Sequence, residues 1–221
     1  MTSLELTSMH GLLLAAGMGL LGASLSLLAD LLIARLLPRF GRLPRGRVRT
    51  ATAAITAVVC FAFALRMEDE PVLPAFVFLG VLGIQLARID IELHLLPDPL
   101  VLLLLAGGAA LLTASTLAGE PWSDLVKAVS GGAILFVIYL VLALISPKGI
   151  GMGDVKLAAP VGLYLGYLGW TQLLYGGLLG FIVGGIASAV LVGRGPEKTP
   201  AEVAYGPSML AAAIAVVLVS A

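Results

Sequence analysis

Long apolar runs are the feature of this sequence that most restricts its fold. The first run, residues 11–36, contains only two charged side chains, Asp30 and Arg35. An α-helix rises 1.5 Å per residue, so about 20 apolar residues cross the roughly 30 Å hydrocarbon core of a bilayer. Of the 221 residues, 60% are hydrophobic and 12% are charged, whereas about 25% are charged in soluble domains. The sequence therefore predicts a membrane protein.

Eight stretches approach the length of a membrane-spanning helix. They are residues 11–36, 49–65, 71–86, 98–117, 125–145, 155–170, 171–192 and 205–221. The third and sixth are short, so we expect them to end on protein-lined polar surface rather than in lipid. The sixth and seventh meet near Gly169, where we expect a tight turn. No linker long enough to separate domains interrupts the stretches, which predicts an all-α bundle of about eight transmembrane spans in a single membrane-embedded domain, residues 1–221.

Composition excludes several other classes of protein and site. Cys60 is the only cysteine, so neither an internal disulfide nor a multi-thiolate zinc site can form. The 13 Lys and Arg residues balance 13 Asp and Glu residues, so no excess of positive charge points to a nucleic-acid partner. Pairs of glycines within the spans, such as Gly131 and Gly132, are typical of close helix packing in lipid.

Basic residues are confined almost entirely to alternate connections between the spans. All of the 13 except Arg66 and Lys127 lie in or beside the first, third, fifth and seventh connections. Lys and Arg in short loops remain on the cytoplasmic side of a membrane. We therefore expect these four connections to face the cytoplasm, with the lipid bilayer around the spans and both termini outside.

Acidic residues within or beside the spans are candidates for function, because ionisable groups are costly at membrane depth. Asp30 lies inside the first span, where we expect it to pair with Arg35 or with a neighbouring helix. The remaining acids form two groups that the topology places on the same side of the membrane. They are Asp90, Glu92 and Asp98 after the third span, and Asp154 at the start of the sixth.

The second group has a glycine-rich sequence, Gly-Ile-Gly-Met-Gly-Asp, that ends at Asp154. Gly151 and Gly153 allow positive φ angles or close approach of a bound chain, and Asp154 is expected to cap the helix that follows. A second carboxyl group nearby would share one proton with Asp154, as in aspartyl proteases. An ordinary helix cap behind a glycine-rich turn would have the same sequence.

The two acidic segments together resemble the prepilin peptidases, which are membrane aspartyl proteases of the GxGD type. Ile89–Asp90 followed by Leu96–Pro97–Asp98 is similar to the ID…LPD segment of that family, and residues 151–157 are similar to its GxGDVKL segment. The resemblance extends from about Ile84 to the C-terminus. It is weak at residues 203–207, where Ala204 and Tyr205 replace the Pro and Phe of a PFGP segment.

This resemblance implies that Asp90 and Asp154 are the catalytic pair. It also implies cleavage of the short basic leader of type IV prepilins or pseudopilins at the cytoplasmic face of the inner membrane, without a metal or organic cofactor. Asp98 would be a supporting residue; its own pattern, Asp followed by Pro99, is that of a helix N-cap. Lys156 would stabilise a nearby carboxylate or extend to lipid headgroups.

A basic leader would be repelled by the arginine-rich loop at residues 38–47, so we expect acidic residues such as Glu92, Asp98 or Glu202 to contact it. That loop also lacks the paired CxxC motifs that bifunctional members of the family carry together with their N-methyltransferase activity. This difference favours a protein that acts only as a peptidase.

Two other functions fit parts of the pattern. A proton-coupled transporter would also contain acids and a glycine-interrupted helix at membrane depth, although its acids are expected near the middle of spans rather than at their ends. A catalytically inactive component of pilus assembly would use the glycine-rich turn only as structure. Retention of both acids favours the peptidase, and nothing in the sequence indicates the oligomeric state.

Overall fold

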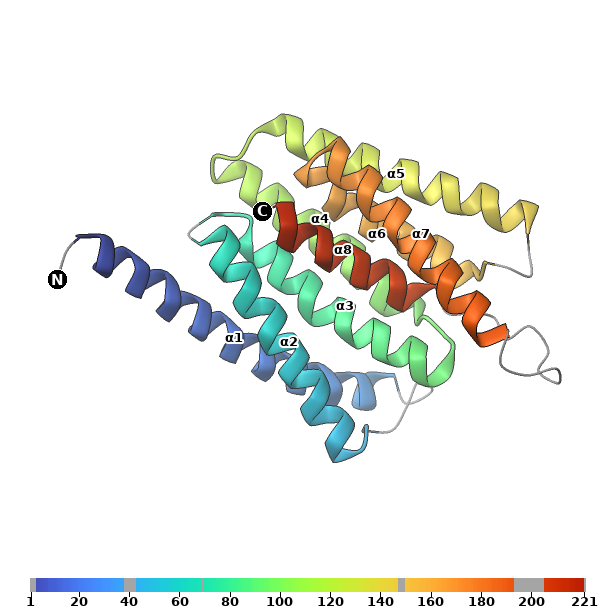
Figure 1. The fold of residues 1–221 in the computed structure, drawn as a ribbon, viewed down its shortest axis with the longest axis horizontal. Coiled ribbons are helices and arrows are strands. Elements are labelled where there is room, and N and C mark those ends of the chain that lie inside the picture. Colours follow the sequence, from blue (N-terminus) through green and yellow to red (C-terminus); the bar gives the residue numbers. More distant parts are fainter. Residues whose placement is uncertain (1–2, 38–42, 69, 147–149, 193–204, 221) are drawn as a thin grey trace.

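The protein is helical throughout the part that the structure describes. A computed structural model describes residues 3–37, 43–68, 70–146, 150–192 and 205–220. Within these residues the chain forms eight α-helices and no strand, packed as one bundle (Figure 1). The helices are α1 (Ser3–Leu36), α2 (Gly46–Met67), α3 (Leu73–Leu93), α4 (Asp98–Leu117), α5 (Trp122–Ile145), α6 (Met152–Leu168), α7 (Trp170–Val192) and α8 (Gly206–Ser220).

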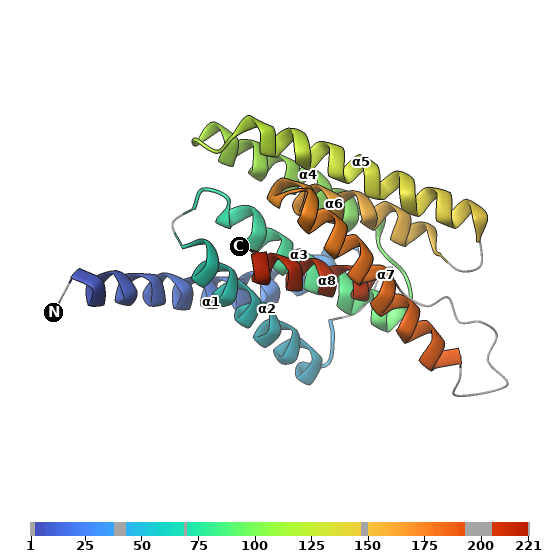
Figure 2. The same ribbon diagram turned by 45° about the horizontal axis from the view of Figure 1, so that its top comes forward.

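The predicted all-α bundle is confirmed. Among the described residues, four helices are long and apolar enough to cross a membrane, namely α1 from Met9 onward, α2, α4 and α5, and the shorter apolar segments are Trp170–Ile186 of α7 and the whole of α8. The protein is therefore a membrane protein. Figures 1 and 2 show the N-terminal part of α1 projecting beyond the rest of the bundle; leucines there, such as Leu13 and Leu20, are exposed.

The prediction for the end of the third helix was wrong. The apolar pattern placed that end at Leu86, but α3 continues to Leu93. Nothing between these residues breaks a helix, because polar and charged side chains there leave the backbone free to continue hydrogen bonding. The helix ends where His94 adopts a left-handed conformation with φ 51° and donates its backbone N–H to the carbonyl oxygen of Asp90 at 2.8 Å. Asp90 therefore lies on a helix and not in the segment after it.

Helices α3 and α6 form the centre of the bundle and contain much of its buried core. Glycines allow α5 to approach α6 closely. A Cβ atom at Gly131 would lie only 2.6 Å from the carbonyl oxygen of Gly162, and one at Gly132 would lie 3.0 Å from that of Ala159. The packing role predicted for this glycine pair is confirmed, and the contact fixes α5 against the helix that carries Asp154.

The predicted tight turn between the sixth and seventh helices is confirmed. Gly169 alone separates Leu168 of α6 from Trp170 of α7. Its φ of 142° lies in a region that side-chain-bearing residues rarely adopt. Glycine therefore permits α7 to reverse direction and pack beside α6.

Asp30 joins three helices near one end of the bundle. Its side chain is fully buried, accepts a hydrogen bond from Arg88 of α3 at 3.0 Å and lies 3.8 Å from Arg49 of α2. Gln85 of α3 accepts hydrogen bonds from Arg88 and donates to Ser26 of α1. The expected partner on a neighbouring helix is thus confirmed. This network fixes α3 two residues before Asp90.

Candidate active site

Asp90 and Asp154 lie at the same end of the bundle although 64 residues separate them. Asp90 is in the last turn of α3 and Asp154 is in the first turn of α6. Both are almost completely buried, with 4% and 5% of their surfaces exposed. Helix α8 begins beside them at Gly206 (Figure 1). We call this end of the bundle, defined by Asp90, Asp154 and Gly206, the site end.

The two carboxyl groups both contact Gly206. A Cβ atom built at Gly206 would lie 2.6 Å from Oδ2 of Asp90, so that oxygen lies directly against the glycine backbone. The backbone N–H groups of Tyr205 and Gly206 donate to the carboxyl group of Asp154, which also interacts electrostatically with Asp90. The structure therefore brings together the two acids that the sequence singled out, with the start of α8 as the third element of the site.

Asp154 has a different place in its helix from the one predicted. Gly151 is the N-cap of α6, and Asp154 is the third helical residue. The N–H of Asp154 donates to the carbonyl oxygen of Gly151 at 3.1 Å, and the N–H of Gly151 in turn donates to the Asp154 carboxyl group. The second of these bonds is one half of a capping box, in which the side chain of the third residue binds the N-cap amide, whereas the first is a backbone turn because glycine has no side chain to complete the box. The amides of two helix N-termini, α6 and α8, thus converge on one carboxyl group.

Gly151 and Gly153 do not adopt positive φ angles, and Gly153 serves close packing. Gly151 has φ −72° and ψ 148°, which any residue can adopt, and Gly153 is not among the positive-φ glycines of the described chain. A Cβ atom at Gly153 would lie 3.1 Å from Cβ of Leu96. The side chain of Leu96 also lies 3.3 Å from the Cβ position of Gly206. Leu96 therefore packs between the glycine-rich turn and the start of α8.

The two acids differ in their hydrogen bonding. Among the described residues, Oδ2 of Asp90 is buried without a hydrogen-bond partner. The carboxyl group of Asp154, in contrast, accepts from the N–H groups of Gly151, Tyr205 and Gly206. Amide donors favour the charged form of a carboxyl group over the protonated form. The surroundings of the pair are therefore asymmetric, with most of the donors on Asp154.

Asp98 and Lys156 pair with each other, so of the two roles expected for Lys156 the structure shows contact with a carboxylate. Asp98 is the first residue of α4 and makes no capping hydrogen bond, since the N-cap is Pro97. The carboxyl oxygens of Asp98 accept from Nζ of Lys156 at 2.8 and 2.7 Å. The N-cap prediction for Asp98 was therefore wrong. Its ion pair connects the start of α4 to the start of α6, outside the buried carboxyl pair.

The other predicted site residues are not gathered around the pair. Glu92 is exposed and lies 3.4 Å from Arg88, one turn earlier on α3. Glu202 lies outside the described residues. No group of three or more His, Cys, Asp or Glu side chains in the described chain could hold a metal ion.

Sequence reasoning missed Gly206. The segment around it was noted only as a weak match to a family segment, and its role as the contact point of both acids depends on how α8 packs. The Gly206–Pro207 pair was the available signal, because proline is favoured in the first turn of a helix.

Comparisons with known proteins agree with this geometry. Residues 76–189 match the type IV leader peptidase family. A prepilin leader peptidase/N-methyltransferase from Bacillus subtilis (strain 168) is 31% identical over 164 residues, which are 74% of this chain and 61% of that protein. The protein of the same name from Aeromonas salmonicida (strain A449) is 31% identical over 74% of this chain and 58% of its own. That from Klebsiella pneumoniae is 35% identical over 55% and 53%.

The family match covers both candidate acids, but the chain does not span the whole length of these relatives. The chain spans about 60% of the length of the Bacillus and Aeromonas proteins. No solved structure matches it significantly. The family match covers more than half of the chain and includes Asp90 and Asp154. The chain therefore belongs to the type IV leader peptidase family.

Proposed function

We propose that this protein is an aspartyl endopeptidase of the membrane that removes the short basic leader from type IV prepilins or pseudopilins. The observation that carries the proposal is the convergence of two buried carboxyl groups, from α3 and α6, on Gly206. A water molecule held between two such groups can be activated by one of them while the other protonates the substrate. Residues 1–221 would act as one peptidase domain.

The two acids take opposite roles in the proposed reaction. Two carboxyl groups at short range share one proton, because ionising both in a buried site is costly. One of Asp90 and Asp154 is therefore ionised while the other is protonated. The ionised acid would be the general base that activates water, and the protonated acid would be the general acid that protonates the scissile carbonyl oxygen.

The reaction then proceeds in two balanced steps. The ionised acid takes a proton from water as the water oxygen bonds to the carbonyl carbon, and the protonated acid gives its proton to the carbonyl oxygen, forming a tetrahedral diol. In the second step the C–N bond breaks. The acid that took the proton from water passes it to the leaving amine nitrogen, and its partner recovers a proton from a hydroxyl of the diol as the new carboxyl group forms.

The site end is proposed to face the cytoplasm at the inner membrane. Arg49 and Arg88 bind Asp30 at this end, and Arg45 and Arg47 lie at the start of α2 beside it, which is the asymmetry expected of cytoplasmic loops. In a Cys60→Ser background, a cysteine at Gly46 should react with a membrane-impermeant reagent only from the cytoplasm, and one at Glu120 only from outside. The opposite pattern would place the site on the wrong face for this substrate.

Leader binding and methylation are finer points of the same proposal. Glu92 is exposed at the site end, and with Glu202 it is a proposed contact of the basic leader. The relatives are named as both peptidases and N-methyltransferases. The cysteine-free loop at residues 38–47 leads us to propose the peptidase activity alone.

The test is co-expression with candidate prepilins, followed by mass measurement of the pilin N-terminus. Asp90→Asn and Asp154→Asn should each abolish cleavage, because an amide can neither accept the proton of water nor return one. The double variant should be no worse than either single one. Asp124→Asn is the matched control, since Asp124 lies at the opposite end of the bundle, paired with Lys127 at 2.6 Å.

Normal cleavage by Asp154→Asn would refute the aspartyl mechanism. The expected mass is that of a pilin that has lost its leader and whose new N-terminus is unmethylated. A methylated product would contradict the peptidase-only assignment. If the protein cleaved no prepilin but carried out proton-coupled uptake of a solute that depended on the two acids, a transporter would be favoured instead.

A further inference from the structure

Tyr139 has a buried hydroxyl group that the fold does not use. The residue lies on α5 with 2% of its surface exposed. Its hydroxyl oxygen is buried and has no hydrogen-bond partner within the described chain. A buried hydroxyl without a partner destabilises the folded state, so phenylalanine would suit a purely structural position better.

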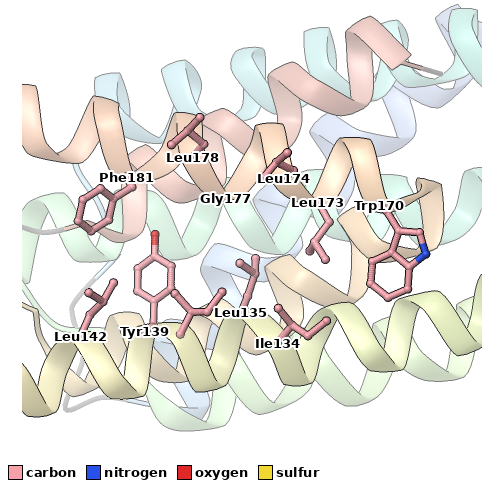
Figure 3. A pocket seen from close by; sticks show the side chains of 11 residues that line it. Ile134, Leu135, Tyr139, Leu142, Trp170, Leu173, Leu174, Gly177, Leu178 and Phe181 are labelled. Carbon is pink, nitrogen blue, oxygen red and sulfur yellow. The ribbon is translucent and has the colours of Figure 1, made fainter.

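The ring of Tyr139 lies in a groove between α5 and α7. Figure 3 shows the ring extending from α5 among apolar side chains of both helices, with its hydroxyl directed away from α5. The groove has a volume of about 500 Å³, and its walls include Leu142, Leu178 and Phe181. Apart from the indole nitrogen of Trp170, the Tyr139 hydroxyl is the only polar side-chain group among the residues that line it.

The groove lies close to the candidate active site. Gly131 of α5 packs against Gly162 of α6, and Gly132 packs against Ala159. The register of this antiparallel pair places Tyr139, about two turns further along α5, level with the first turn of α6, which carries Asp154. The ring of Tyr205 stacks on that of Phe181, with centroids 6.3 Å apart and an interplanar angle of 27°. Phe181 lines the groove, and the N–H of Tyr205 binds Asp154, so these two aromatic residues connect the groove to the carboxyl pair.

We propose that Tyr139 is a third catalytic residue, whose hydroxyl donates a hydrogen bond to the carbonyl oxygen of the scissile peptide bond. This inference rests on the proposed peptidase function. Tyr139 makes no hydrogen bond to Asp154, so it does not act by holding that carboxyl group in place. In the proposed complex, a peptide bond attacked by water from the carboxyl pair lies beside the Tyr139 hydroxyl. Its carbonyl oxygen gains negative charge during that attack. The proton stays on the tyrosine, and the hydrogen bond strengthens in the transition state.

Tyr164 provides a matched control within the same chain. It is fully buried, and its hydroxyl likewise has no partner among the described residues. That hydroxyl lies against Gly108 of α4, where a Cβ atom would be 2.6 Å away. Tyr164 is ten residues beyond Asp154 on α6, or about 15 Å along the helix. A phenylalanine at either position removes the same oxygen, but only Tyr139 adjoins the acids.

The experiment uses the full chain in lipid nanodiscs and a peptide spanning the leader junction of a prepilin cleaved in co-expression. Tyr139→Phe should lower kcat by about 10- to 100-fold with KM within about twofold, since loss of one such donor reduces transition-state stabilisation. Tyr164→Phe should behave as the parent. Replacement of Tyr139 by 4-aminophenylalanine, which keeps an N–H donor there, should recover most of the lost kcat even if the phenylalanine variant is less stable.

Three results would overturn the proposal. One is normal kcat for Tyr139→Phe, and another is an effect confined to KM, which would make Tyr139 only a wall of the groove. The third is a 4-aminophenylalanine variant no more active than Tyr139→Phe. These outcomes are separate from failure of the proposed function, which would appear as no cleavage by the parent protein, or as cleavage that persists in Asp90→Asn and Asp154→Asn.

Discussion

Gly206→Ala should slow cleavage strongly with little effect on the fold. The added Cβ atom would lie 2.6 Å from Oδ2 of Asp90, whereas ordinary van der Waals contact begins near 3.4 Å. The carboxyl oxygen must therefore move by about 0.8 Å. A misplacement of about 1 Å in a catalytic group can cost about 100-fold in rate. We expect kcat/KM to fall by about 10- to 100-fold, equivalent to about 1.4–2.7 kcal/mol in the activation free energy.

The stability of the variant distinguishes this effect from misfolding. Gly206 does not have a positive φ angle, so alanine can adopt its backbone conformation without strain. Replacing glycine by alanine at a compatible backbone position stabilises a protein by about 0.4–1 kcal/mol, because the unfolded chain has fewer conformations to lose, which would offset part of the contact with Asp90. The melting temperature in detergent should therefore stay within a few degrees of the parent while the cleavage rate falls.

Two glycines in open surroundings serve as controls. A Cβ atom at Gly17 of α1 or at Gly185 of α7 would meet nothing within 4 Å, so alanine there should leave cleavage unchanged. Cleavage by Gly206→Ala within about twofold of the parent rate would show that the position of Asp90 against α8 does not matter. The start of α8 would then not be part of the active site.

The helices were predictable because apolar runs of sufficient length have few alternatives in a membrane. The predicted fourth helix, residues 98–117, agrees with α4 at both ends. The first and fifth were placed correctly at their C-terminal ends, Leu36 and Ile145. The error at α3 has a physical cause. Hydropathy marks where lipid contact ends, but a helix ends only where the backbone stops hydrogen bonding, and that point is His94.

Asp90 and Asp154 could be selected from the sequence because an acidic residue and the residues next to it can be recognised without knowing the fold. Their meeting at Gly206 could not, because it depends on how three helices distant in sequence pack. Tyr139 was also invisible, since a tyrosine within an apolar helix usually serves the core. Asp98 was misassigned because a local capping pattern competed with a stronger partner, Lys156, that lies 58 residues away in the chain.

Two further predictions concern ion pairs at the site end. Asp30→Asn should lower the yield of folded protein and its melting temperature in detergent, because breaking a buried ion pair costs about 3–5 kcal/mol. Arg88 would keep its charge with only 11% of its side chain exposed. An unchanged melting temperature would contradict this prediction. Asp98→Lys and Lys156→Asp should each reduce cleavage by no more than about fivefold, because an exposed pair contributes up to about 1 kcal/mol. Combining the two changes restores opposite charges across the starts of α4 and α6, so the double variant should recover most of the activity. A double variant as weak as the worse single one would mean that Asp98 acts through something other than this pair, and direct binding of the leader would then be the better explanation.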